Sequence, residues 1–493
     1  MRAMEKKLKN KSGISLIVLV ITIVILIVLS TITISTIWGD NGLVEQVKIT
    51  KDKTTNVTTG KSNDVNKLLQ EFSDIMSEEE IKPEPQEPPL DGSFYENKGV
   101  NSPKIDTNME LVVFDENTNM WVKDITREGY SYIDTSISEN NNKSEWANAK
   151  VTIDNIDSYF VWIPRYAYKI LYYTDDSKTT ISSTPTVYGT IDIKFIKGVG
   201  TEATDGTRCK YASDSTLNPA VDYIIHPAFT TNASLGGGWN EELPGLWIGK
   251  YEASLANKED GSNIVANSSN ANILLEENTD KAVVTKPGYS SWIYCRIGRM
   301  YDNAKYYAPD LKSHILKNSE WGAVAYLTDS KYGRNGVEVT INNNGTTFYT
   351  GGGAENSYIK NTNQSSTGNV YGIYDLSGNA WEYVASYYNG ADANKTNIGY
   401  GSSFANIGGA SNEYVTVYSG TELSTNYKYG DATFETSGWN KDNSRFVDAN
   451  TLFFYRGGSY GSGSTGGIFN YSSYLRKCKY QYRLAYCINC MIK

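Results

Sequence analysis

Few residues in this chain combine the types and the spacing that could do chemistry. Cys487 and Cys490 form a C-x-x-C pair, which is the spacing of zinc and redox sites, but a single pair close to the last residue is a weak signal for either. Cys478 stands alone, and five cysteines are too few for a disulfide-rich scaffold. The only histidines are His226 and His314, which leaves little material for histidine-based metal sites or catalysis. We expect His226 to be structural and assign His314 no role.

The composition narrows the function classes further. The chain has 493 residues and a net charge of −9, with no long basic run outside the extreme N-terminus, so a nucleic-acid partner is disfavoured. Glycine and tyrosine are abundant, at 43 and 38 residues, whereas phenylalanine numbers 13. Because tyrosine tolerates water at one end while it packs at the other, this excess indicates a large half-exposed surface rich in strands and loops.

The N-terminus predicts a membrane anchor. Residues 1–13 are basic, and residues 14–38 contain no charge. A helix of that length would extend about 37 Å, enough to cross a hydrocarbon core of about 30 Å. The basic flank favours a cytoplasmic N-terminus and a single pass, with the remaining chain outside the cell membrane. A removable secretory signal is the alternative, but the apolar run is too long for one.

The stretch KSGISLIVLVITIVILIVLS resembles the N-terminal segment of type IV prepilin-like proteins. The resemblance implies a leader at residues 1–13, which a prepilin peptidase removes between Gly13 and Ile14. Pilins that assemble carry Glu at the fifth mature position, where this chain has Val18. Processing is therefore expected, whereas the missing carboxylate argues against assembly into a fibre.

Residues 39–92 read as a helical stalk that ends in a linker rich in Pro and Glu, which cannot build a core and favours an extended tether. Residues 93–147 read as a small β-rich segment, in which MELVVFDENTNMWVKD predicts a hairpin around a polar turn. SYFVWIPRYAYKILYY, at residues 158–173, predicts one or two further strands.

Residues 148–493 resemble the formylglycine-generating (sulfatase-modifying factor) domains. The resemblance rests on motifs in the order of that family: HPAF at 226–229, GLWIGKYEAS at 245–254, NSEWGAVAYL at 318–327, NVYGIYDLSGNAWEYVA at 369–385, FYRGGSY at 454–460 and YRLAY at 482–486. It implies a C-type-lectin-like fold with a small twisted β core and long ordered loops. The whole chain is thus expected to be α+β, with an N-terminal transmembrane helix before this domain.

The same resemblance bears on cofactors and catalysis. It implies a structural Ca²⁺ held by Asp375, by the backbone carbonyls of Gly378 and Ala380, and by the carboxylate of Glu382. The alternative is that Glu382 caps backbone amides and that Asp375 sits in an Asx turn. The oxidising members of the family use two cysteines just after the RGGS motif, and no cysteine follows Ser459 closely here. We therefore expect no enzymatic activity.

Residues 456–486 also resemble the variable region of proteins encoded beside diversity-generating retroelements. An ordered beginning, RGGSY, is followed by residues with no period of 2 or 3.6. Tyr, Ser and Gly on a rigid scaffold are typical of diversified binding surfaces. The expected ligand-binding residues are Tyr460, Ser462, Thr465, Tyr471, Ser473, Tyr474, Leu475, Arg476, Cys478, Tyr480 and Tyr482. The tyrosines 460, 471, 474 and 480 and Arg476 should face outward, whereas Arg456, Gly457, Gly458 and Arg483 should be structural.

Three function classes compete. The first, which we favour, is a membrane-anchored cell-surface protein, receptor- or adhesin-like, that binds an extracellular protein or glycan. The second is a minor pilin or pseudopilin subunit, against which Val18 counts. The third is a formylglycine-generating oxidase, against which the missing cysteine pair counts.

Overall fold

The computed structural model describes residues 87–137, 143–278, 280–389, 410–449, 451–474, 484–485 and 488–489. Residues 87–493 form one compact unit. The predicted leader, the apolar run at 14–38 and the stalk as far as residue 86 lie outside the described residues. Within the described part, no helix is long and apolar enough to cross a membrane.

The described residues form a sheet-rich α+β structure. The largest N-terminal sheet has the strand order β11-β6-β5-β3-β4, with every neighbouring pair antiparallel. Its strands are β3 (Met109–Asp115), β4 (Met120–Lys123), β5 (Asn148–Ile153), β6 (Ile156–Pro164) and β11 (Gly245–Gly249). The predicted hairpin is confirmed as β3 and β4. Because β3 pairs with β5, strands from both sides of the expected boundary between residues 147 and 148 belong to one sheet.

The second large sheet carries the C-terminal motif. It has the order β17-β16-β18-β19, and β20 pairs with β16 beside this path. The strands are β16 (Trp381–Tyr388), β17 (Thr416–Tyr418), β18 (Phe453–Arg456), β19 (Tyr471–Tyr474) and β20 (Leu484–Ala485). Strands β18 and β19 are antiparallel, in a register that sets Arg456 opposite Tyr471. The chain between these two strands therefore forms a long excursion that leaves the sheet and returns beside its starting point.

Smaller sheets complete the β structure. One has the order β8-β7-β10-β9, another β13-β12-β14, and two are pairs, β1-β2 and β15-β21. Their strands are β1 (Phe94–Tyr95), β2 (Val100–Asn101), β7 (Tyr166–Tyr172), β8 (Gly189–Phe195), β9 (Lys210–Tyr211), β10 (Ile224–Ile225), β12 (Ser254–Asn257), β13 (Asn263–Ile264), β14 (Lys281–Val284), β15 (His314–Ile315) and β21 (Ile488–Asn489). Strands β6 and β7 confirm the prediction for residues 158–173.

Helices are few among the described residues. The α-helices are α6 (Ile297–Tyr307), α7 (Asn318–Asp329) and the single turn α8 (Leu423–Asn426). Short 3₁₀ turns lie at Pro227–Phe229, Ala233–Leu235, Leu275–Glu277, Pro309–Leu311, Gly345–Thr347, Thr350–Gly352, Ser357–Ile359, Thr362–Gln364, Trp439–Lys441 and Gly463–Thr465. The loops between them are long, as the sequence predicts.

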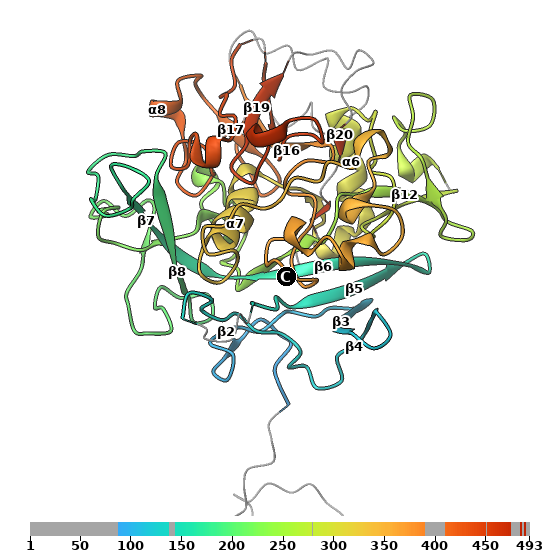
Figure 1. Cartoon of the computed structure of the whole chain (residues 1–493), viewed down its shortest axis with the longest axis horizontal. Helices are drawn as coiled ribbons and strands as arrows, with labels where there is room; N and C mark the ends of the chain where they lie inside the picture. Colours follow the sequence, from blue (N-terminus) through green and yellow to red (C-terminus); the bar gives the residue numbers. More distant parts are fainter. Residues whose placement is uncertain are drawn as a thin grey trace, which may run out of the picture. The chain divides into compact units, whose positions relative to one another are not determined.

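Helix α7 forms the centre of the domain. Figure 1 shows it between the β5–β6 region of the first sheet and the β16–β19 region of the second. All its residues are buried, which is unusual for a helix that contains Asn318 and Glu320. Glu320 accepts a hydrogen bond from the backbone N–H of Lys317 at 2.8 Å and so caps the first turn. The polar residues at this end of α7 therefore have partners on the loops that surround them.

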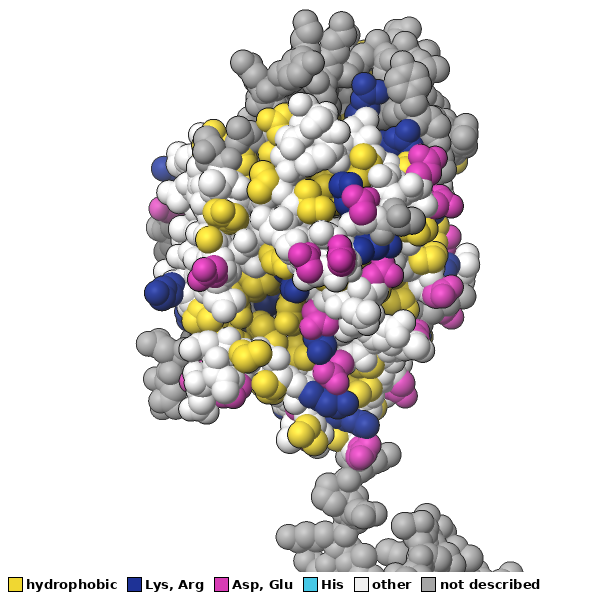
Figure 2. Space-filling view, turned by 90° about the vertical axis from the view of Figure 1, so that its right-hand side faces the viewer, with side chains coloured by type: hydrophobic (Ala, Val, Ile, Leu, Met, Phe, Trp, Pro, Cys, Tyr) yellow, Lys and Arg dark blue, Asp and Glu magenta, His cyan; other side chains and the backbone are white. Residues whose placement is uncertain are grey.

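The charged side chains are interspersed on the face shown in Figure 2. Lys and Arg alternate with Asp and Glu over much of this face, and hydrophobic side chains gather around a hollow in its lower half. This mixture differs from the continuous basic stripe that is typical of nucleic-acid-binding surfaces.

Candidate functional site

The buried guanidinium of Arg456 anchors the start of the C-terminal motif. Its Nε donates to Oδ1 of Asn318 at 3.0 Å, Nη1 donates to the carbonyl oxygen of Ala432 at 2.8 Å, and Nη2 donates to the carbonyl oxygen of Asp431. The ring of Tyr471 lies 5.5 Å from the guanidinium carbon. Arg456 therefore joins β18 to helix α7, to the loop at 431–432 and to β19, in agreement with its predicted structural role.

Gly457 and Gly458 turn the chain out of β18. Both have positive φ, 76° and 80°, which favours glycine. The carbonyl oxygen of Gly457 accepts a hydrogen bond from the N–H of Gly378 at 3.0 Å. A Cβ atom on Gly458 would lie 2.8 Å from the Cα of Gly466, closer than such atoms approach. The close approach of Gly458 and Gly466 brings the two ends of the excursion together.

Residues 459–470 contain the predicted ligand-binding residues Tyr460, Ser462 and Thr465, and after this prediction we call them the binding loop. Its tip is exposed at Tyr460, whose ring packs edge-on against Phe348 at 5.2 Å and is 37% exposed. Thr465 is also exposed. Ser462 is half-buried, and its hydroxyl accepts a hydrogen bond from the N–H of Ser459 at 2.9 Å. These three of the predicted ligand-binding residues therefore lie together at the tip of one loop.

The base of the binding loop is buried and held by its neighbours. Trp321 of α7 donates from Nε1 to the carbonyl oxygen of Ile468 at 2.7 Å. The N–H of Phe469 donates to Oδ2 of Asp442 at 3.0 Å, and the N–H of Asn443 donates to the carbonyl oxygen of Thr465 at 3.0 Å. The loop thus has an exposed tip on a fixed base.

Two of the predicted binding residues face inward instead. Tyr471 is fully buried, with its hydroxyl 3.2 Å from that of Ser437, and the outward orientation predicted for it is wrong. Ser473 is buried as well, and its hydroxyl donates to the carbonyl oxygen of Phe446 at 2.9 Å. The reason is the alternation of side chains along β19, which directs both residues to the face that packs on the core.

The structure does not describe the side chains of the remaining predicted residues. Tyr474 ends β19, where the backbone alone is described. Leu475, Arg476, Cys478, Tyr480, Tyr482 and the structural candidate Arg483 lie outside the described residues. Their predicted roles stay predictions.

The predicted calcium ligand Asp375 is a buried acceptor of amide hydrogen bonds. Its carboxylate accepts from Nδ2 of Asn342 at 2.9 Å and from the N–H of Gly351 at 3.0 Å. The N–H of Glu252 approaches the same carboxylate at 3.4 Å. Burial raises the pKa of Asp375 to about 6, and these hydrogen bonds oppose the rise. These partners are distant in the sequence, so amide donors from other segments, and not the Asx turn considered above, account for the contacts of Asp375.

Of the other predicted ligands, Gly378 and Ala380 lie on the turn that follows Asp375, and Glu382 lies in β16. Gly378 donates to Gly457, and the N–H of Ala380 donates to Oε1 of Glu252 at 3.2 Å. Glu382 is buried, and its charge adds to burial in raising the pKa of Glu252. In the described part of the chain, no group of three or more His, Cys, Asp or Glu is placed to hold a metal ion. A calcium ion on Asp375 would have to displace amide donors, so this carboxylate fits the ion poorly.

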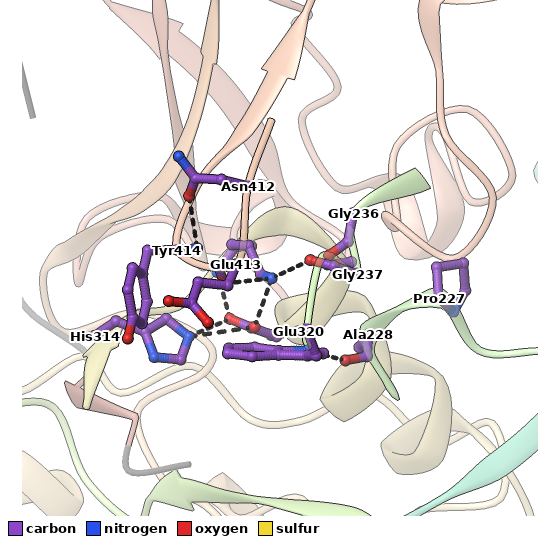
Figure 3. A network of polar contacts seen from close by, with 12 residues as sticks. Pro227, Ala228, Gly236, Gly237, His314, Glu320, Asn412, Glu413 and Tyr414 are labelled. Atoms are coloured by element: carbon purple, nitrogen blue, oxygen red, sulfur yellow. Dashed lines mark hydrogen bonds and ion pairs between the residues drawn. The ribbon is translucent and has the colours of Figure 1, made fainter. Parts of the chain in front are cut away.

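Sequence reasoning missed a polar network around His314, drawn in Figure 3. His314 places Nε2 3.1 Å from Oε2 of Glu320 and Nδ1 2.8 Å from the carbonyl oxygen of Lys312. Lys317 donates from Nζ to the carbonyl oxygens of Gly237 at 2.7 Å and Glu413 at 2.8 Å. The network joins three segments that are far apart in the sequence.

The burial of this network decides what it can do. His314, Lys317 and Glu320 are each at most 1% exposed, and the indole of Trp239 covers Nζ of Lys317 at 4.3 Å. Burial lowers the pKa of Lys317, whereas the charge of Glu320 opposes that shift. Because no side chain of this triad reaches the surface, the geometry supports loop positioning rather than catalysis.

His226 is structural, as predicted. It is fully buried between aromatic rings, and its Nδ1 accepts a hydrogen bond from the N–H of Ala228 at 3.3 Å. Burial lowers the pKa of His226 to about 3, so the ring is neutral at physiological pH.

Comparison with known proteins gives no independent evidence on the functional site. No protein-family model matches the chain, and a search of curated proteins finds no match. Among the predicted sites, the tip of the binding loop combines exposure with a fixed base and therefore is the best candidate functional site.

Proposed function

We propose that the chain is a membrane-anchored, cell-surface ligand-binding protein, receptor- or adhesin-like, whose binding loop contacts an extracellular protein or glycan. The observation that carries the proposal is the contrast between the exposed tip at Tyr460–Thr465 and the buried base at 466–470. A loop that is already ordered loses less conformational entropy when it binds. Tyr supplies contact area at low entropic cost, and Ser, Gly and Thr adapt their hydrogen bonds to the partner.

The proposed fold of residues 148–493 is C-type-lectin-like, of the formylglycine-generating type. The support is the sheet-rich architecture with few helices and long ordered loops, together with the positions of the motif residues at its centre. Arg456, Trp321 and Glu252 each belong to one of the motifs, and each bonds a different motif or loop. The segment that follows β19 is proposed to extend the binding surface and to be the diversified part.

The proposal assigns no oxidase activity to the domain. Cys209 and Cys295, the cysteines in the described part of the chain, are buried. Burial raises the pKa of Cys209 to about 11, which keeps it a thiol at neutral pH. Because the nucleophilic form of cysteine is the thiolate, Cys209 does not resemble a reactive cysteine, and Cys295 is fully buried.

The decisive experiment compares two tyrosines of nearly equal exposure. Tyr460 and Tyr188 are 37% and 36% exposed, but Tyr188 lies just before β8, away from the binding loop in the sequence. Cells displaying the full chain are tested for adhesion to arrays of immobilised surface proteins and glycans. We expect Tyr460→Ala to weaken adhesion by about 2 kcal/mol, the size typical of an aromatic hot spot, and Tyr188→Ala to leave it unchanged.

Melting temperature separates binding from folding in this experiment. Both variants should melt close to the wild type, since exposed substitutions typically cost about 0.5 kcal/mol or less. Equal adhesion of both variants and the wild type would remove the tip from the binding surface. The genomic locus gives an independent test of diversification. Diversification is supported if the locus contains a near-copy of the segment that encodes residues 456–486, and if this copy differs mainly at adenines and lies beside a reverse transcriptase gene.

A further inference from the structure

Two carboxylates meet beneath the base of the binding loop. Glu338 lies on the segment after α7, and Asp442 directly follows the 3₁₀ turn Trp439–Lys441. A Cβ atom on Gly467 would collide with Oε1 of Glu338 and with both carboxylate oxygens of Asp442. The two acids, distant in the sequence, therefore converge on one point of the loop, where only glycine leaves them room.

Each carboxylate has one oxygen that lacks a partner. Oε1 of Glu338 and Oδ1 of Asp442 are buried atoms without a hydrogen bond to the described residues. Asp442 is only 4% exposed, so water does not easily replace the missing partner. A buried acceptor left unsatisfied costs about 1–3 kcal/mol. A single proton between the two oxygens would satisfy both, because one carboxyl would donate and the other would accept.

The charged groups nearby do not neutralise the pair. Arg334, on the same segment as Glu338, directs its guanidinium to the carbonyl oxygens of Val337 and Glu338 at 3.5 and 3.2 Å. Asp329, at the end of α7, adds negative charge near Glu338. Lys441 precedes Asp442 but is exposed, and in the described part of the chain neither acid forms an ion pair.

The titration of the two acids agrees with one bound proton. Burial, and then the charges of Asp442 and Asp329, raise the pKa of Glu338 to about 9. Burial raises the pKa of Asp442 to about 7, while the N–H groups of Phe469 and Asn470 oppose the rise. The pair therefore keeps one proton well above the pH at which an exposed carboxyl loses it, and the amide donors to Asp442 favour the anion at that acid.

We propose that Glu338 is a positioning residue of the binding loop, which donates a hydrogen bond from its protonated carboxyl to Asp442 and forms with it a latch for residues 465–471. Asp442 in turn accepts the N–H of Phe469, and its neighbour Asn443 donates to Thr465 and accepts from Tyr471. Loss of the proton leaves two adjacent negative charges against Gly467, and their repulsion loosens the base of the loop. The hydrogen bond between Glu338 and Asp442 is proposed independently of the proposed function. Only its effect on ligand binding rests on that function.

Amide exchange on the full-length protein tests the latch. Glu338→Gln keeps a hydrogen-bond donor at the same place but has no proton to lose, and Glu116→Gln, an exposed glutamate on the β3–β4 turn, is the control. Exchange rates of residues 465–471 are measured between about pH 6 and pH 10 and corrected for intrinsic chemistry. A carboxyl of raised pKa stabilises at low pH, and that contribution is lost as the pH rises through its folded-state value.

We therefore expect protection of residues 465–471 in the wild type and in Glu116→Gln to fall by up to about tenfold per pH unit as the pH rises towards about 9, and to level off above that pH. In Glu338→Gln the fall should be clearly smaller, because the contribution of Glu338 is removed while those of Asp329 and Asp442 remain in all three proteins. Parallel profiles in all three proteins would overturn the proposal, as would a Glu338→Gln chain that fails to fold, because the amide retains the donor. Protection that rises with calcium and falls with a chelator in the wild type alone would identify a cation site instead. Adhesion is not measured, so failure of the proposed function leaves this result unaffected.

Discussion

The Nε atom of Arg456 donates to Oδ1 of Asn318 at 3.0 Å, and this contact joins β18 to the first turn of α7. The same guanidinium satisfies the carbonyl oxygens of Asp431 and Ala432. Arg456→Ala would leave three buried acceptors without donors, each at a cost of about 1–3 kcal/mol. We expect the free energy of unfolding, measured with urea, to fall by at least about 3 kcal/mol.

Arg456→Lys should also be destabilising, because one ammonium group cannot reach all three acceptors in the fork geometry of a guanidinium. Arg445→Ala is the matched control, since the Arg445 side chain is 58% exposed and pairs with Asp448 on the surface. Its cost should be about 0.5 kcal/mol or less. If the Arg456 and Arg445 variants have equal free energies of unfolding, the buried guanidinium does not contribute to the stability of the domain.

The sequence predicts the beginning of the C-terminal motif well and its continuation poorly. Gly457 and Gly458 directly follow β18. A pair of glycines at the end of a strand indicates that the backbone turns there or passes close to another segment. Tyr471 is misplaced because residues 459–470 form a loop with no period, so the alternation of β19 starts at a position that only the pairing with β18 reveals. Tyr460, on the loop tip, needs no register to be exposed.

Buried cations account for most of what sequence reasoning missed. Arg165 donates to the carbonyl oxygen of Phe229, Lys250 to those of Val370 and Gly372, and Lys317 to that of Gly237. Charged residues are normally assigned to the surface, and no local pattern marks these as interior. In a domain with few helices and long loops, many carbonyl oxygens lack regular partners, and buried cations supply the donors.

Acid should weaken the network around His314 through Glu320. Burial would raise the pKa of Glu320, but the charges of Lys317 and His314 and the hydrogen bonds that Glu320 accepts lower it below its usual 4.5. A depressed carboxyl contributes stability above its unfolded-state pKa and loses it as the pH falls through the folded-state value. The urea concentration at the unfolding midpoint of the wild type should therefore decrease when the pH is lowered below about 4.5. Glu320→Gln should be less stable at neutral pH and should lose less on acidification.

The exposed Glu276, on a 3₁₀ turn far from the network in the sequence, supplies the control for this comparison. Glu276→Gln should follow the acid dependence of the wild type, since an exposed carboxylate with ordinary partners contributes little. If Glu320→Gln follows the same curve as both, the acid sensitivity arises elsewhere in the domain.

Calcium should have little effect on the turn at Asp375. Because its carboxylate accepts amide hydrogen bonds from Asn342 and Gly351, we expect the melting temperature to be the same with calcium and with a chelator. Asp375→Asn should be destabilising, because one oxygen becomes an amide donor that faces other donors. A melting temperature that rises with calcium in the wild type and not in Asp375→Asn would favour the ion that the family resemblance implies.

The N-terminal segment yields the last prediction. A prepilin-type leader should be cut between Gly13 and Ile14, because the basic residues before the glycine and the apolar run after it resemble the peptidase recognition pattern. The intact mass of the membrane form, in cells with an active prepilin peptidase, should correspond to a chain that begins at Ile14. A bulky residue in Gly13→Leu should block cleavage and leave residues 1–13 in place. Val18→Glu serves as the matched variant, since it restores the acid of assembling pilins and should leave cleavage unchanged. A wild-type chain that keeps residues 1–13 in such cells would reject the leader and leave the apolar run as an uncut anchor.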